Sequence, residues 1–109
     1  GTVTGNDSNI VENNIIRDRS DAASSPSSLV YASGSAGALR NSGNVIRNNE
    51  IYNFTGSAIN ITSQTTYPNE ALNENWTIVG NEIYQSAAGS GTVFSIVLPA
   101  AVPGSGVAG

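Results

Sequence analysis

The chain lacks cysteine, histidine, methionine and lysine. Without cysteine there are no disulfides, thiolate metal sites or thiol nucleophiles. Only four arginines stand against eight acidic residues, which gives a formal net charge of -4. This balance argues against nucleic acid or an anionic membrane surface as a partner, because the chain has no basic patch or arm. No apolar run reaches the roughly 18 residues that a spanning helix needs, so the sequence predicts no membrane span.

The chain is instead rich in asparagine, serine, glycine and threonine, and it repeats one short motif three times. The motif is Ile-x-x-Asn-x-Ile, and its copies begin at Ile10, Ile46 and Ile78. They lie about 36 and then about 32 residues apart, which is a period typical of solenoid repeats. The repeat predicts one domain in which successive copies stack.

Each copy predicts a strand, a sharp bend and a second strand. We place the bend at the asparagine, because asparagine tolerates the left-handed backbone region that a tight bend requires. The alignment then puts isoleucines from either side of the bend into two interior columns, with tyrosine on the outer face. The interior columns are Ile10, Ile46 and Ile78, and Ile15, Ile51 and Ile83, and the outer column is Ile16, Tyr52 and Tyr84.

Further strands are predicted at residues 29–32, 58–62 and 93–98, where apolar residues alternate or cluster. The segments 17–28, 33–44 and 63–75 are predicted as loops, because small and polar residues dominate them. No apolar pattern with a period of about 3.6 residues persists beyond a turn, so the sequence predicts no helix.

From Ile46 to Ile61 the sequence follows IxxNxI…GxxIxI, which resembles one coil of the right-handed parallel β-helix of the pectate-lyase-like superfamily. The resemblance covers roughly residues 8–98, as about three coils. It implies an all-β fold with long loops, in which residues 1–98 form the coils and residues 99–109 form a Pro/Gly-rich C-terminal tail. It also implies that Asn13, Asn49 and Asn81 stack as a ladder of side-chain amides.

The best-known members of that family cleave acidic polysaccharides. Their sites, as the resemblance implies them, need calcium-binding carboxylates with an Arg or Lys base, or several Asp with His and Lys nearby. This chain has three Asp and neither His nor Lys. We therefore assign no catalytic residue, and a fragment of a polysaccharide lyase or glycoside hydrolase stays open as an alternative.

One predicted loop concentrates charge, with Arg17, Asp18, Arg19 and Asp21 in close succession. The two carboxylates could ligate calcium through oxygen, and the arginines could hold a sugar carboxylate. A self-neutralising polar loop is the simpler interpretation. The sequence predicts no cofactor, with calcium bound at this loop as the alternative.

Two further sets of residues are candidates for surface contacts. Tyr52 and Tyr84 occupy equivalent positions in successive copies, where outward rings could bind sugar in a carbohydrate-binding adhesin or pack at an assembly contact. Among the Asn-x-Ser/Thr sequons, Asn53 and Asn75 are the better candidates for glycosylation.

The ends of a stack of about three coils need cover, because each would present unpaired strand edges and apolar interior. No amphipathic capping helix is predicted at either end. We therefore expect a non-catalytic structural module that stacks head to tail with copies of itself, or with the rest of a longer parent chain. The Cys-free, Lys-free and Asn/Ser/Thr/Gly-rich composition favours an extracellular or cell-surface location.

Overall fold

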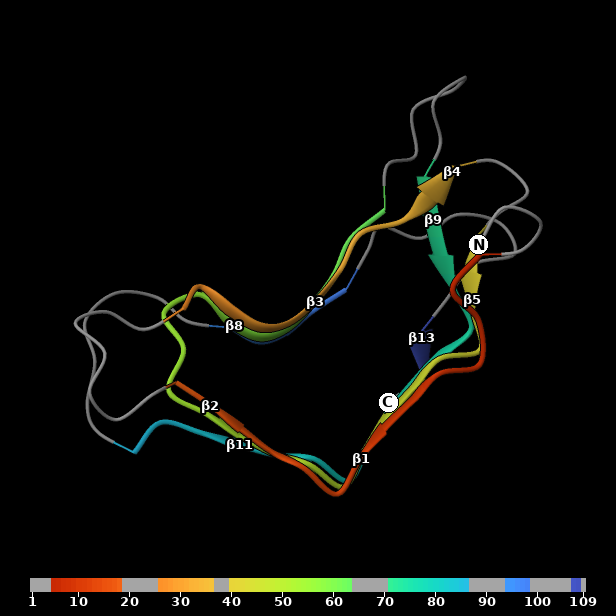
Figure 1. Cartoon of the computed structure of the whole chain (residues 1–109). Coiled ribbons are helices and arrows are strands. Elements are labelled where there is room, and N and C mark those ends of the chain that lie inside the picture. Colours follow the sequence, from red (N-terminus) through yellow and green to blue (C-terminus); the bar gives the residue numbers. More distant parts are fainter. Residues whose placement is uncertain are drawn as a thin grey trace.

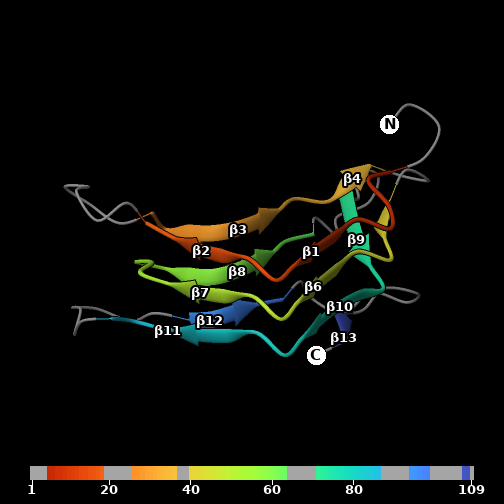
Figure 2. The ribbon, with the colours of Figure 1, turned by 60° about the horizontal axis from the view of Figure 1, so that its bottom comes forward.

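The computed structural model describes residues 5–18, 26–36, 40–63, 71–86, 94–98 and 107–108, and these contain strands but no helix. The main strands form three layers that lie on one another (Figures 1 and 2). The first layer holds β1 (Ile10–Glu12), β2 (Ile15–Arg17) and β3 (Ser28–Ala32). The second holds β6 (Val45–Arg47), β7 (Glu50–Tyr52) and β8 (Ser57–Ile61). The third holds β10 (Trp76–Val79), β11 (Glu82–Tyr84) and β12 (Phe94–Val97).

Equivalent strands of successive layers pair in parallel and build three sheets. Sheet A joins β1, β6, β10 and β13 (Val107–Ala108), sheet B joins β2, β7 and β11, and sheet C joins β3, β8 and β12. Seen along the stack, the three layers overlay one another around an apolar interior (Figure 1). The predicted all-β class and the parallel pairing are confirmed, and the arrangement is compatible with a β-solenoid.

A fourth, smaller sheet D lies in segments that the sequence analysis predicted as loops. It contains β4 (Ser35–Ala36), β5 (Asn41–Ser42) and β9 (Ala71–Glu74), with β4 antiparallel and β5 parallel to β9. Asparagine, glutamate and alanine are poor strand formers, so their composition hides these strands. Hydrogen bonds between layers hold them in place. Likewise, β13 lies within the segment 99–109 that was predicted as a tail.

The corner between sheets A and B is made by a residue with positive φ in every layer. These residues are Asn13 (φ 58°), Asn48 (φ 55°) and Gly80 (φ 66°). Asparagine and glycine are the residues that enter this region at least cost. A Cβ atom on Gly80 would lie 2.5 Å from Oδ1 of Asn48, so a larger residue there would require the Asn48 side chain to move. The bend residue is therefore the one before the asparagine that the repeat alignment chose in the second and third copies.

The first copy is shifted by one residue relative to the predicted alignment. Val11 pairs with Ile46, and Ile16 pairs with Ile51. Ile10 and Ile15 were predicted to face the interior, and this is wrong, because their side chains are 54% and 67% exposed. The observed columns are Val11, Ile46 and Ile78; Ile16, Ile51 and Ile83; and, on the outer face, Arg17, Tyr52 and Tyr84.

The shift has a simple origin in the sequence. The first copy contains Ile10-Val11, Asn13-Asn14 and Ile15-Ile16, so both alignments satisfy a pattern of two apolar residues flanking an asparagine. The bend chooses between them, because the residue with positive φ must precede the asparagine that bonds to the next layer.

Burial is most complete in the middle layer, although Ile78 and Trp76 of the third layer are buried as well. The inward side chains of β6, β7 and β8 are at most 1% exposed, namely Ile46, Ile51, Ile59 and Ile61. The equivalent side chains of the outer layers are less covered: Val30 is half-buried and Ile96 is 38% exposed. Each end of the stack therefore presents apolar interior.

Candidate functional site

A ladder of side-chain amides runs through the three layers at the corner between sheets A and B. The backbone N–H and Nδ2 of Asn14 both donate to Oδ1 of Asn49, at 3.0 and 3.2 Å. The backbone N–H and Nδ2 of Asn49 donate in turn to Oδ1 of Asn81, both at 3.0 Å. The ladder residue of the first layer is therefore Asn14 and not the predicted Asn13, which makes the exposed bend instead.

Two further sets of stacked asparagines lie beside sheet A, and the sequence analysis missed both. In one set, Oδ1 of Asn41 accepts from the Asn6 N–H at 3.0 Å, and its Nδ2 donates to Oδ1 of Asn73 at 3.0 Å. In the other, the N–H and Nδ2 of Asn9 both donate to Oδ1 of Asn44 at 2.9 Å. These stacks add side-chain bonds to the backbone pairing between layers, because Asn41 and Asn73 are also register partners and the Asn9 carbonyl accepts from the Val45 N–H at 2.8 Å.

The signal that would have found these stacks is the asparagine spacing itself. Asparagines at 6, 9, 13 and 14 recur at 41, 44, 48 and 49, which is a constant offset of 35 residues (41 − 6 = 49 − 14). The predicted alignment used an offset of 36, taken from isoleucines, which occur next to one another in the first copy. A spacing of several identical polar residues defines register better than a spacing of apolar ones.

The outer face of sheet B carries a stack of one cation and two aromatic rings. The rings of Tyr52 and Tyr84 lie 4.8 Å apart between centroids, with an interplanar angle of 13°. The Arg17 guanidinium carbon lies 6.0 Å from the Tyr52 centroid, on the side away from Tyr84 because the three residues occupy successive layers. A stacked aromatic pair and a cation over a ring each contribute about 0.5–1.5 kcal/mol.

This stacking limits what the tyrosines can bind. A sugar packs against the flat face of an aromatic ring, but Tyr52 has Tyr84 on one face and Arg17 on the other. Tyr84 is the last ring of the column, so its second face points along the stack toward the end of sheet B. Tyr84 is therefore the better placed of the two rings for either predicted contact, and the sugar contact and the assembly contact both stay predictions.

The Tyr84 hydroxyl donates a hydrogen bond to Oε1 of Glu50, one layer away. This bond, with partial burial and the nearby negative charges of Glu50 and Glu82, raises the pKa of Tyr84 from 10.0 to about 12. Because the folded pKa lies above the ordinary value, the stabilisation is fully present below pH 10. It is lost as the pH rises through about 12, when the phenolate would face the Glu50 carboxylate.

We therefore predict that one tyrosine titrates late when phenolate absorbance is followed against pH. The Glu50→Gln substitution removes the charge beside the phenol, so this last step should move back toward pH 10. Tyr84→Phe should remove the step and so assign it. Identical titration curves for Glu50→Gln and the parent chain would contradict the assignment.

The charge cluster predicted at residues 17–21 lies only partly within the described residues. Arg17 donates through Nη1 to the Asp18 carbonyl at 3.1 Å, and its guanidinium lies over Tyr52. Arg19 and Asp21 lie outside the described residues. Within the described ranges, no group of three or more Asp, Glu, His or Cys side chains is placed to hold a metal ion.

Two other ion pairs join successive layers. Nε of Arg47 lies 2.6 Å from Oε2 of Glu12 on sheet A, and Nη1 of Arg40 lies 3.1 Å from Oε2 of Glu74 beside sheet D. The first pair joins residues that are register partners in β6 and β1. Both ion pairs link neighbouring layers, so each of these four charged groups has an oppositely charged partner within the structure.

The two candidate glycosylation sites differ in their surroundings. Asn75 is exposed, and its Nδ2 lies 3.4 Å from the Ser42 hydroxyl. Asn53 is half-buried, and its Oδ1 accepts from the backbone N–H and hydroxyl of Ser86 at 3.1 and 2.8 Å. Asn75 is the more accessible acceptor of the two.

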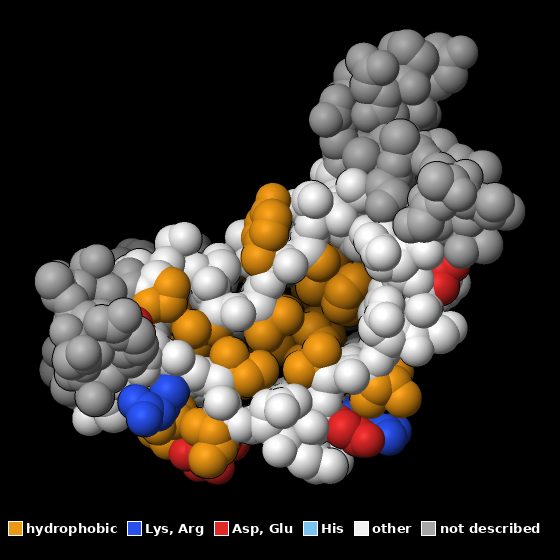
Figure 3. Space-filling view, viewed as in Figure 1, with side chains coloured by type: hydrophobic (Ala, Val, Ile, Leu, Met, Phe, Trp, Pro, Cys, Tyr) orange, Lys and Arg blue, Asp and Glu red, His pale blue; other side chains and the backbone are white. Residues whose placement is uncertain are grey.

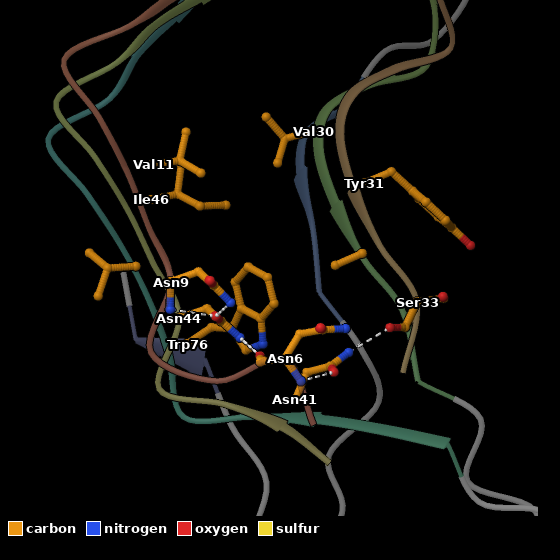
Figure 4. Close-up of a pocket in the computed structure, with 12 residues that line it drawn as sticks. Asn6, Asn9, Val11, Val30, Tyr31, Ser33, Asn41, Asn44, Ile46 and Trp76 are labelled. Atoms are coloured by element: carbon orange, nitrogen blue, oxygen red, sulfur yellow. Dashed lines mark hydrogen bonds between the residues drawn. The ribbon is translucent and has the colours of Figure 1, made fainter. Parts of the chain in front are cut away.

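A pocket of about 390 Å³ opens at the first-layer end of the stack. In the space-filling view along the stack, apolar side chains fill the hollow between the sheets and face the viewer (Figure 3). The close-up shows Val11 and Ile46 on one wall facing Val30 on the other, with Trp76 deeper and Tyr31 pointing away (Figure 4). The pocket is the open end of the interior, rather than a cleft with converging catalytic groups.

Comparisons with known proteins do not extend these observations. The chain matches no family model, no curated protein and no solved structure. In the ranges that the structure describes, no helix is long and apolar enough to cross a membrane.

Proposed function

We propose that the chain is a non-catalytic, extracellular structural module that stacks head to tail with copies of itself into a filament or surface fibre. In this proposal its layers are about three coils of a right-handed parallel β-helix of the pectate-lyase-like type, to which the parallel sheets and the asparagine ladder are suited. The rest of a longer parent chain is the alternative partner for the same end surfaces.

The observation that carries the proposal is that sheet C buries its apolar side chains fully in the middle layer and less completely in the layers at the two ends. Ile59 in β8 is 0% exposed, whereas its partner Ile96 in β12 is 38% exposed. Its other partner, Val30 in β3, lines the open pocket. A further layer at either end would give these side chains the cover that Ile59 already has, at about 25 cal/mol for each Å² of apolar surface removed from water.

The direction of the hydrogen bonds in the ladder supports head-to-tail stacking. Each asparagine donates to Oδ1 of the asparagine in the next layer, from Asn14 to Asn49 to Asn81. By the same step, the Asn81 N–H would donate to Asn14 Oδ1 of a second copy. Two like ends brought together would oppose donor to donor or acceptor to acceptor, so a two-fold dimer does not continue the ladder.

In the single chain, β13 occupies the edge at which a second copy would pair. β13 pairs with β10 through Trp76 and Thr77, on the edge where β1 of a second copy would pair. It makes two register pairs, whereas β1 makes three with β6. Stacking in register therefore requires β13 to leave β10, an exchange in which the incoming strand offers the longer ladder.

We expect size-exclusion chromatography and electron microscopy to show assembly that increases with concentration and yields elongated particles. A variant ending at Leu98 lacks β13 and should assemble at lower concentration than the full chain, because the edge of β10 is then open. The full chain is its matched control. A stable monomer at micromolar concentration, for both the full chain and the shortened one, would overturn self-stacking.

A further inference from the structure

We propose that Arg17 and the pair Tyr84 and Glu82 form the contact that sets the register between stacked copies. The proposal rests on the head-to-tail stacking proposed above and names the side chains that would recognise the partner. It follows from the order of residues along the outer face of sheet B, where Arg17, Tyr52 and Tyr84 occupy successive layers.

Within one molecule the arginine–tyrosine part of this contact already exists once. The Arg17 guanidinium lies over the Tyr52 ring at 6.0 Å from its centroid, and Glu50 is the register partner of Ile15 on the neighbouring strand. A cation over an aromatic face is attracted by the ring quadrupole. Arginine in the first layer therefore already lies over the tyrosine of a Glu-x-Tyr strand.

The third layer repeats that Glu-x-Tyr strand and leaves it at the edge of sheet B. Glu82, Ile83 and Tyr84 pair with Glu50, Ile51 and Tyr52 residue for residue. If a second copy adds its β2 beside β11 as β2 adds to β7, its Arg17 lies over Tyr84, with Glu82 two residues before the tyrosine. The recognised strand is thus presented twice, once inside the molecule and once at its end.

Charge complementarity selects a second copy as the occupant. The first-layer edge of sheet B carries the exposed Arg17 and the third-layer edge carries the exposed Glu82. The two edges of the same sheet therefore have opposite charge, and each fits the other end of an identical chain. A shift of the incoming strand by one residue would place Arg17 over Ile83 and lose both partners, so the contact fixes the register.

A charge exchange tests the contact. Arg17→Glu alone places two carboxylates at the junction, and Glu82→Arg alone places two guanidinium groups there. Each single variant should need about tenfold or more higher concentration to assemble than the parent chain, because like charges oppose association. An equimolar mixture of the two variants restores opposite charges at every alternating junction, so it should assemble at a lower concentration than either variant alone.

Arg17→Lys is the matched control, because it keeps the charge and should still assemble. Both changed side chains are exposed, so circular dichroism of each variant should match that of the parent. Glu82→Arg should also keep the thermal unfolding of the parent, whereas Arg17→Glu should lower it slightly because the cation over the Tyr52 ring is lost.

The outcomes separate the two proposals. If the parent assembles and the single variants assemble equally well, or their mixture fails to recover, the Arg17 contact is overturned while stacking stands. If the parent itself stays monomeric, both are overturned.

Discussion

Ile51→Ala should lower the free energy of unfolding by about 2–5 kcal/mol, as buried isoleucine-to-alanine changes do. Ile51 is 0% exposed, lies in the middle layer and packs in the apolar cluster that the three sheets enclose. Covered by a layer above and one below, the site has little freedom to collapse around the cavity. The measurement is urea unfolding followed by circular dichroism, at a concentration where the protein does not assemble.

Ile15→Ala is the matched control, because it removes the same atoms from a strand of the same sheet. Its side chain is 67% exposed on the outer face of β2, so the change should stay within about 0.5 kcal/mol. The pair of variants also tests the register. A large loss at Ile15 would restore the alignment first predicted from the isoleucine repeat and contradict the observed pairing of Ile16 with Ile51.

Asn49→Ala should cost about 1–3 kcal/mol, because it leaves buried polar groups of the neighbouring layers without partners. The Asn49 side chain is 2% exposed. Its Oδ1 accepts from the N–H and Nδ2 of Asn14, and its Nδ2 donates to the Val11 carbonyl at 2.9 Å and to Oδ1 of Asn81. Alanine supplies neither donor nor acceptor, so the ladder is interrupted in the middle.

Asn13→Gly provides the contrast, because Asn13 is exposed and makes the bend outside the ladder. Glycine already makes the equivalent bend at position 80, and it enters positive φ without steric cost. This change should alter stability by less than about 1 kcal/mol. Equal losses in the two variants, or a loss of only a few tenths of a kcal/mol for Asn49→Ala, would mean that the ladder does not stabilise the fold.

The fold class could be predicted from the sequence because several features of the repeat indicate the same architecture. The motif predicted strands around a bend at an interval that suits stacking, and the absence of helical periodicity removed the main competing architecture. Strands predicted at residues 29–32, 58–62 and 93–98 correspond to β3, β8 and β12. Each depends on local apolar content, which sequence reasoning handles well.

The register of the strands could not be predicted from the sequence, because register depends on two strands and not on one. Ile10 and Val11 are equally apolar, and Asn13 and Asn14 are identical, so no local preference separates the two alignments. The decision comes from contacts across 35 residues, such as the pairing of Glu12 with Arg47. The stacks formed by Asn41 and Asn44 were missed for the same reason, since asparagine in a polar segment looks like loop until its partner is identified.

The candidate contact residues were found only in part. Tyr52 and Tyr84 were placed together correctly by their equal positions in the repeat, and their rings stack. Arg17 was assigned to a charged loop, because the shifted alignment put Ile16 below the tyrosines. Moving the first copy by one residue brings Arg17 into the column and connects two features that the sequence analysis had treated separately.

The three layers use different lengths of chain to cover the same path. The corner between sheets A and B is invariant, since Val11 to Ile16, Ile46 to Ile51 and Ile78 to Ile83 span equal numbers of residues. From sheet B to sheet C, by contrast, the chain runs directly from Tyr52 to Ser57 in the second layer, but from Arg17 to Ser28 in the first. The corner between sheets A and B thus has the same length in every layer, whereas the connection between sheets B and C accommodates segments of different lengths. A change in the length of the B-to-C connection is therefore compatible with the asparagine ladder, which joins layers whose connections differ.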